Sequence, residues 1–199
     1  MTAQQLGFLS SAQVSALTPE QIKALLPKQL AAINSAAIPA LKLEAVTAIQ
    51  MSALTAGQVS QMSSDQVNKL SPTQIGAINY NAINSMSQNN FDTLNLGGLS
   101  SIQLSALSTI KTGKLGPDKI GLLTPGQFSG LSASALNQFS VEQLKKITAL
   151  QLGALGPSTL NKLSSKVLKN LDPTQLKGLV ANSNNLGADN RGILFSRLV

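Results

Sequence analysis

The side chains that most often carry chemistry in proteins are scarce here, because the sequence contains no cysteine and no histidine. Histidine is the commonest metal ligand and the commonest general base near pH 7, and cysteine supplies thiolate metal ligands and disulfides. Of the acidic residues, Glu20, Glu44 and Glu142 stand alone, with no second carboxylate or base nearby in the sequence. We therefore predict a protein that is not an enzyme and has no metal site and no cofactor.

The lysines are the second group with chemical potential. The net charge is +7, and eleven of the fifteen basic residues follow residue 110. The densest group, and the candidate site for a polyanion, is Lys145, Lys146, Lys162, Lys166, Lys169 and Lys177. Such a surface would attract nucleic acid, but clustered arginines and the aromatic residues on which bases stack are missing. We interpret these lysines as solvated charges, and keep nucleic-acid or other polyanion binding by the C-terminal half as the alternative.

An eight-residue repeat determines where all these residues lie. An apolar residue (site one) recurs every eight residues, and a second apolar residue (site six) follows five positions later in 20 of 21 copies, Thr112 being the exception. The copies include "LTPEQIKA" from Leu17 and "LSPTQIGA" from Leu70. They cover residues 1–178, with five-residue phase breaks at 49–53 and 94–98. We expect residues 179–199, which lose the repeat, to form a C-terminal cap or to begin another module.

Within each copy the polar residues are typical of the beginning of a helix. Position two is Ser or Thr in 14 copies, position five is Gln in 12, and seven of the eight prolines occupy position three. A hydroxyl, a proline at the first helical residue and a Gln three residues after the hydroxyl form a capping box. Acidic residues gather at position four and lysines at positions seven and eight, as the helix dipole favours. Each octad therefore predicts a helix of about two turns.

These short helices predict an all-α solenoid with one helix per octad. One continuous helix is excluded, since a period of eight rotates the apolar pair by about 80° per copy and proline interrupts the chain. A β-solenoid is the alternative, although sites one and six would then face opposite sides of a strand. A two-turn helix is unstable alone in water, so each must pack on its neighbours.

The pattern L-[ST]-x-x-Q-[VIL]-x-x resembles the octapeptide-repeat tracts of very large bacterial surface or secreted proteins. The resemblance covers residues 1–178 and implies an extracellular or cell-surface structural or adhesive spacer. "LTPEQIKAL" is also similar to the first helix of the TAL-effector DNA-binding repeat. That likeness is limited to one capped helix, because the period of that family is about 34 residues and no base-reading pair recurs here.

From this resemblance we expect a structural or adhesive segment at the cell surface or outside the cell, with a protein, a cell surface or a second copy as partner. We do not expect a small-molecule substrate. In-register residues at the start, Met1 at site one and Leu6 at site six, suggest end-to-end self-assembly. The first residues do not resemble a signal peptide, so a cytoplasmic location is the alternative, and no apolar run reaches the ~18 residues of a transmembrane helix.

Overall fold

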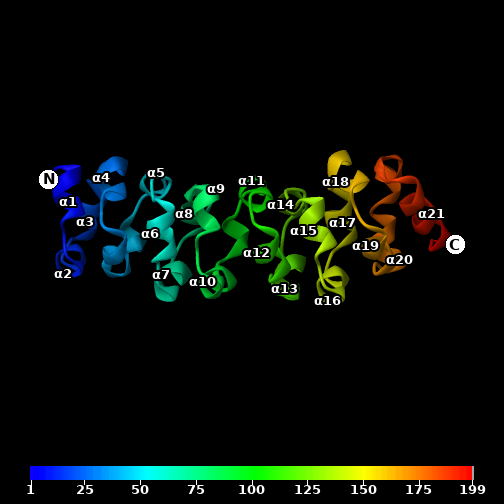
Figure 1. Cartoon of the computed structure of the whole chain (residues 1–199), viewed down its shortest axis with the longest axis horizontal. Coiled ribbons are helices and arrows are strands. Elements are labelled where there is room, and N and C mark those ends of the chain that lie inside the picture. The colour runs from blue at the N-terminus through cyan, green and yellow to red at the C-terminus, as the bar shows by residue number, and fades with distance from the viewer. Residues whose placement is uncertain (199) are drawn as a thin grey trace. The chain divides into compact units, whose positions relative to one another are not determined.

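The computed structural model describes residues 1–198 as a succession of short helices (Figure 1). Across these residues there is no β-strand, so the predicted all-α solenoid is confirmed and the alternative β-solenoid is wrong. The chain divides into two compact units, residues 1–99 and 100–199, each described separately below.

The first unit contains ten α-helices and three 3₁₀ helices within the described part of the chain. They are α1 (Ala3–Gly7), α2 (Ser11–Ser15), α3 (Pro19–Lys23), α4 (Pro27–Ala31), η1 (Ser35–Ala40), η2 (Leu43–Ala45), α5 (Ala48–Met51), α6 (Ala56–Ser60), α7 (Ser64–Asn68), α8 (Pro72–Ala77), α9 (Tyr80–Ile83), α10 (Gln88–Thr93) and η3 (Leu96–Gly98).

The second unit is also built from short helices. Its helices are α11 (Ser101–Ser105), α12 (Thr109–Gly113), α13 (Pro117–Gly121), α14 (Pro125–Phe128), α15 (Ala133–Asn137), α16 (Val141–Lys145), α17 (Ala149–Gly153), α18 (Pro157–Asn161), α19 (Ser165–Lys169), α20 (Pro173–Lys177), η4 (Val180–Asn185) and α21 (Ala188–Ser196).

The capping box explains why so short a segment becomes helical, and α3 shows its geometry. The Thr18 hydroxyl accepts a hydrogen bond from the Gln21 N–H at 3.2 Å, and Gln21 Oε1 accepts one from the Thr18 N–H at 2.9 Å. Pro19 occupies the first helical position, where an N–H would lack a partner. The same reciprocal pair forms at α1, α2, α5, α6, α7, α8, α11, α14, α16, α17 and α20.

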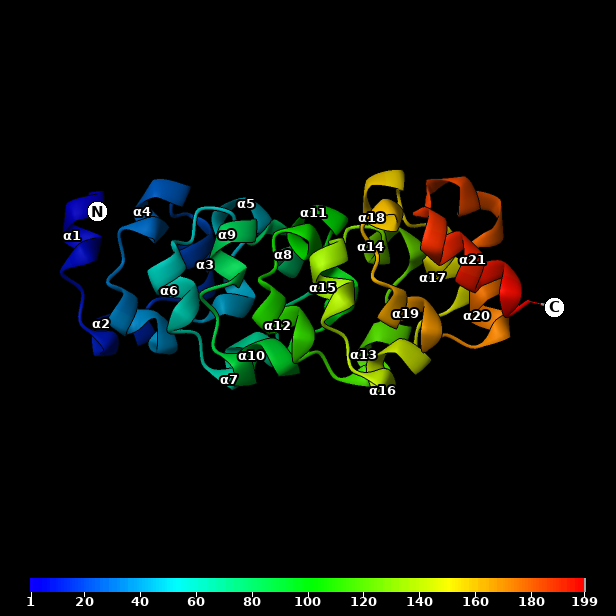
Figure 2. The same ribbon diagram turned by 45° about the vertical axis from the view of Figure 1, so that its right-hand side comes forward.

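Most helices stack on the element three places further along the chain. In the first unit α1 packs on α4, α4 on α5 and α5 on α8, counting η1 and η2 as elements. In the second unit α11 packs on α14, α14 on α17 and α17 on α20. These four helices are labelled in Figure 2. Three octads therefore complete one turn of each solenoid, which gives three columns of stacked helices.

The core of each unit is a double row of aliphatic side chains from sites one and six. Site-six residues such as Ile22, Leu30 and Leu176 are fully buried, and most site-one residues lie at or below 6% exposure. Thr112, the polar residue at site six, is also fully buried, and its hydroxyl donates to the carbonyl oxygens of Ser108 and Thr109. This bond to the preceding turn of its own helix satisfies the hydroxyl without a second polar group in the core.

One column of the second unit requires small residues at octad position eight. The column α11, α14, α17 and α20 carries Ala106, Gly130, Ala154 and Gly178 there, whereas the other columns carry larger residues such as Leu122, Lys146 and Lys162. A Cβ atom on Gly130 would collide with the Ser101 carbonyl, and one on Gly178 with the Ala149 carbonyl. At Gly130 and Gly178 the neighbouring backbone lies too close for a Cβ atom, whereas Ala106 and Ala154 of the same column carry one.

The structure places the first interruption of the octad spacing earlier than residues 49–53. Residues 49–51 lie within α5, which has its own capping box between Thr47 and Gln50. The five-residue interval instead occupies residues 41–45 and contains η2. The second interval coincides with residues 94–98 and contains η3.

Residues after 178 continue the solenoid with different local structure. The 3₁₀ helix η4 packs on α18, and α21 packs on α19. Asn190 of α21 occupies the place that Gln has in the octads, and its Nδ2 donates to the Leu163 carbonyl at 2.7 Å. Residues 188–196 therefore lie against α19 of the preceding turn.

Candidate functional site

The position-five glutamine is the polar group that joins one solenoid turn to the next, and Gln58 of α6 illustrates it. Its Oε1 accepts from the Thr55 N–H at 3.0 Å, which caps α6. Its Nε2 donates to the carbonyls of Leu30, at 3.0 Å, and Ile33, at 2.8 Å. These carbonyls lie at the C-terminal end of α4 and in the link that follows it. One amide therefore serves the beginning of one helix and the end of another.

The same contact recurs through both units. The amide nitrogen of each glutamine bonds carbonyls 25–31 residues earlier, in the pairs Gln50 to Ile22 and Leu25, Gln66 to Ile38 and Leu41, Gln74 to Leu43 and Val46, Gln143 to Thr112 and Leu115, Gln151 to Ile120 and Leu123, and Gln175 to Leu144 and Ile147. Asn90 makes a shorter version to the Met62 carbonyl at 2.5 Å. Carbonyls at helix ends have no partner inside the helix, so these bonds satisfy buried acceptors.

The sequence interpretation explained these glutamines by the cap and did not predict their bonds to main-chain carbonyls of an earlier turn. A capping box accepts Glu or Gln equally well at its third helical position. No octad has Glu at position five, although Gln is there in 12 copies. A carboxylate has no N–H to donate, and buried against carbonyl oxygens it would carry an unpaired charge. The consistent choice of amide over acid was the signal that could have predicted the contact between turns.

The first solenoid turn presents the same glutamines without acceptors. Gln5, Gln13 and Gln21 form their own capping boxes, yet their side chains are exposed, and within the described part of the chain their Nε2 atoms have no hydrogen-bond partner. Gln50 and Gln58, in contrast, are 2% and 1% exposed. Site-one residues Leu9 and Leu25 are also half-buried here, unlike their counterparts in later turns.

A surface hollow lies beside these glutamines. It is lined by Met1, Leu17, Gln21, Ala24, Leu25 and Gln29. Gln29 Nε2 donates to the Met1 carbonyl at 2.6 Å, so the contact between turns begins with this residue. We name the surface formed by Gln5, Gln13, Gln21, Leu9, Leu25 and this hollow the first-turn face.

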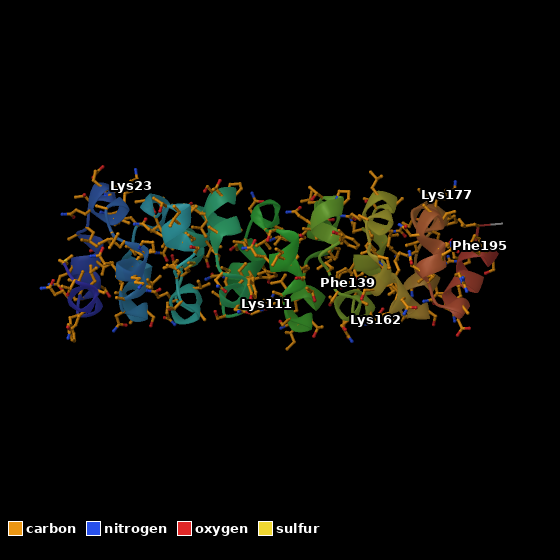
Figure 3. The ribbon with its side chains drawn as sticks, turned by 90° about the horizontal axis from the view of Figure 1, so that it is seen from above. Lys23, Lys111, Phe139, Lys162, Lys177 and Phe195 are labelled. Carbon is orange, nitrogen blue, oxygen red and sulfur yellow. The ribbon has the colours of Figure 1, made fainter. Side chains whose placement is uncertain are left out.

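The six lysines proposed as a polyanion site are spread over four helices in three columns. Lys145 lies in α16 and Lys146 directly after it, Lys166 and Lys169 lie in α19, Lys177 lies in α20, and Lys162 follows α18. Lys162 and Lys177 point to opposite edges of the ribbon in Figure 3. The structure therefore brings only Lys145, Lys146, Lys166 and Lys169 onto one column.

Three of these four lysines already have partners. Lys145 pairs with Glu142 at 3.0 Å, Lys146 pairs with Asp118 at 2.7 Å, and Lys166 donates to the Phe139 carbonyl at 3.3 Å. The hydrogen bond from Lys146 to Asp118 and the charge of that carboxylate raise the pKa of Lys146 above its ordinary 10.5. This pairing lowers the positive charge that the column offers to an anion.

The acidic residue Glu20 interacts with groups that are close to it in the sequence. In Glu20 a hydrogen bond from its own backbone N–H, the Thr18 hydroxyl and the charge of Lys23 lower the pKa of the carboxyl below its ordinary 4.5. This is a carboxylate at a helix N-terminus, where the dipole also favours negative charge. Within residues 1–198 no three acidic side chains come together as a metal site would require.

No protein-family model matches the chain, and no curated protein matches it. Among the described residues, no helix has the length and apolar character needed to cross a bilayer.

Proposed function

We propose that this chain is a non-catalytic structural and adhesive repeat segment of a bacterial cell-surface or secreted protein. The observation that carries the proposal is the glutamine contact between turns, as in Gln58 and Gln151. Together with the caps and the two core sites, it assigns the recurring polar and apolar residues of the octad to holding the solenoid together.

A segment built in this way extends by repetition. Each added octad brings its own cap, its own core residues and its own bond to the preceding turn, so stability grows with length in nearest-neighbour steps. A chain with this property suits a spacer that holds other parts of a large protein away from the cell. The resemblance to bacterial octapeptide tracts supports the same location and role.

The location can be tested on cells that naturally produce the protein. Antibodies raised against residues 1–199 are applied to intact cells, to cells shaved with protease, and to the culture medium. We expect labelling of intact cells that is lost after shaving, or protein in the medium, with a cytosolic marker protected throughout. Labelling that requires lysis of the cells would contradict an extracellular role.

A further inference from the structure

We propose that Tyr80 and Asn81 of α9 form a binding site for a neutral, β-linked polysaccharide. The inference names a ligand for the adhesive role proposed above and rests on that role. The site lies in the first unit, on α9 and on the helix α6 that packs against it.

Two segments of the first unit have the same sequence except at two positions. They are "AINSAAI" around η1 and "AINYNAI" around α9. The residues that differ are Ser35 and Ala36 in the first segment and Tyr80 and Asn81 in the second. The chain therefore contains its own comparison for the tyrosine and the asparagine.

The caps and the buried residues of the two segments are equivalent, although η1 is a 3₁₀ helix and α9 an α-helix. The side-chain oxygens of Asn34 and Asn79 accept from the N–H two residues further on, at 3.0 and 2.9 Å, with φ of −55° and −54° and ψ of 131° in both. In each segment the residue at site one is 2% exposed, the alanine at position five 3%, and the residue at site six 0%. Because serine and alanine serve the same local structure, the fold does not require Tyr80 and Asn81.

Tyr80 and Asn81 carry polar groups that the protein itself does not use. Tyr80 is 45% exposed, and Asn81 is also exposed. Within residues 1–198 neither the Tyr80 hydroxyl nor the Asn81 side-chain amide has a hydrogen-bond partner. A tyrosine ring supplies a rigid apolar contact, and an amide both donates and accepts hydrogen bonds. A sugar matches this pair, because its ring C–H groups can lie on the aromatic face while its hydroxyls bond the amide.

The surroundings of the pair favour a neutral ligand. The helix α9 belongs to the column of α2, η1, α6 and α9, whose octads contain no Asp, Glu, Lys or Arg. These octads are residues 9–16, 33–40, 54–61 and 78–85. Seven of the eight charged residues of the first unit lie instead in α3, η2, α7 and α10 or directly beside them. An acidic or basic polymer would find no opposite charge on this column.

The helix beside α9 leaves space next to the tyrosine ring. In α6 the octad positions of Tyr80 and Asn81 are occupied by Ala56 and Gly57, which are both exposed. The Ser85 hydroxyl donates to the Ala56 carbonyl at 3.0 Å and so joins α9 to α6. A polysaccharide that stacks one sugar on the ring can therefore continue over these small residues. Chains of flat, equatorially linked sugar rings suit such a surface, which is why we name a β-linked polymer.

The test exchanges the two residues for those of the matching segment. In the double variant Tyr80→Ser, Asn81→Ala the segment has the same seven residues as the one around η1, so its local structure should be kept. Tyr80→Phe, which keeps the ring, is a second variant. Ile110→Ser in α12 is the matched control, because it removes an apolar side chain that is 69% exposed in the other unit. Circular dichroism establishes that each variant is folded.

The chain has one tyrosine and no tryptophan, so its tyrosine fluorescence reports on Tyr80 alone. Titration with cellohexaose or chitohexaose should change this fluorescence and saturate between about 0.1 and 10 mM, as expected for a small exposed site. An acidic oligogalacturonate of equal length should cause no saturable change. Saturation-transfer NMR of the sugars compares the variants. We expect binding at least about tenfold weaker for the double variant, and within about threefold of the unmodified chain for Tyr80→Phe and Ile110→Ser.

The absence of a saturable change with both neutral sugars would overturn the proposal, and so would equal binding of the oligogalacturonate. Unchanged binding by the double variant would also overturn it, because the sugar would then be held elsewhere on the chain. Antibody labelling of intact cells can succeed while sugar binding fails, so the two proposals are tested separately.

Discussion

The contribution of a glutamine to the stability of this chain depends on the solenoid turn in which the glutamine lies. Gln58 and Gln13 make the same cap, but only Gln58 also bonds two carbonyls of an earlier turn. An amide that satisfies two buried acceptors contributes more than one whose nitrogen faces water. Octads that share one sequence pattern therefore contribute differently to the stability of the fold.

The variant Gln58→Ala should show this difference against Gln13→Ala. We expect a loss of roughly 2–4 kcal/mol in the free energy of unfolding for Gln58→Ala, and about 1 kcal/mol for Gln13→Ala, which loses the cap alone. Urea unfolding at low protein concentration measures both. Equal losses for the two variants would mean that the bonds to Leu30 and Ile33 contribute nothing.

A second residue-scale prediction concerns Gly178, where an added Cβ would collide with the Ala149 carbonyl. We expect Gly178→Ala to destabilise the protein by about 1–3 kcal/mol, as overpacking does. Gly126→Ala in α14 is the control, because a Cβ there meets no atom within 4 Å. That change should be neutral or stabilising by up to about 1 kcal/mol, since alanine favours a helix. The midpoints of thermal unfolding compare the two.

At the scale of elements, the sequence was sufficient for the helices and insufficient for their stacking. The cap residues Thr18 and Gln21 act within one octad, so their roles could be predicted from spacing alone. The number of octads per turn depends on which helices meet, and one octad carries no information about that. The 24-residue recurrence of small residues at Ala106, Gly130, Ala154 and Gly178 does carry it, but only when three octads are compared.

For the candidate surfaces, too, the sequence predicts the residue types but not where the stacking places them. The lysines follow from the helix dipole, and their spread over three columns could not be predicted before the stacking was known. A phase break predicted at 49–53 removes Gln50 from position five, although "VTAIQM" from Val46 matches the octad at four positions. The structure has the five-residue interval eight residues earlier, around η2.

Deleting octads from the second unit tests the three-column arrangement. Removal of residues 131–138 moves Lys162 into the column where small residues pack, so we expect a large loss of stability or a failure to fold. Removal of residues 131–154 takes out one whole solenoid turn and keeps every later helix in its column. We expect that protein to fold with a helical spectrum in circular dichroism. The opposite order of stability would contradict three octads per turn.

For the whole molecule, the absence of histidine and cysteine predicts a stability that varies little with pH. The pKa of Glu20 is lowered in the fold, so its contribution is present above the ordinary 4.5 and is lost as the pH falls through the lowered value. The pKa of Lys146 is raised, so its contribution is present below the ordinary 10.5 and is lost as the pH rises through the raised value.

We therefore expect the melting temperature to change by less than about 3 °C between about pH 5.5 and 9 and to fall outside that window. Both groups are exposed, so the change from either alone should be small. Differential scanning calorimetry at constant ionic strength measures it. A sharp transition near pH 6.5 would contradict the prediction.

The net charge of +7 leads to a second prediction for the whole molecule, which concerns the binding of DNA. Because Lys145, Lys146 and Lys166 are occupied and Lys162 and Lys177 lie on different columns, random duplex DNA should not be retarded at about 150 mM salt. A gel-shift titration over salt concentration measures this. Retardation that persists at that salt and is lost on Lys162→Gln and Lys169→Gln would favour the polyanion alternative.

The reach of the glutamine contact has a consequence for how the chain is made. The bonds that join one turn to the next connect residues only 25–31 positions apart. A growing or exported chain can therefore complete each turn once about thirty further residues have emerged, without waiting for its distant end. A long chain of this kind could leave a ribosome or a secretion channel already folded behind the point of exit, and that ordered advance would limit the time during which its apolar sites are open to aggregation.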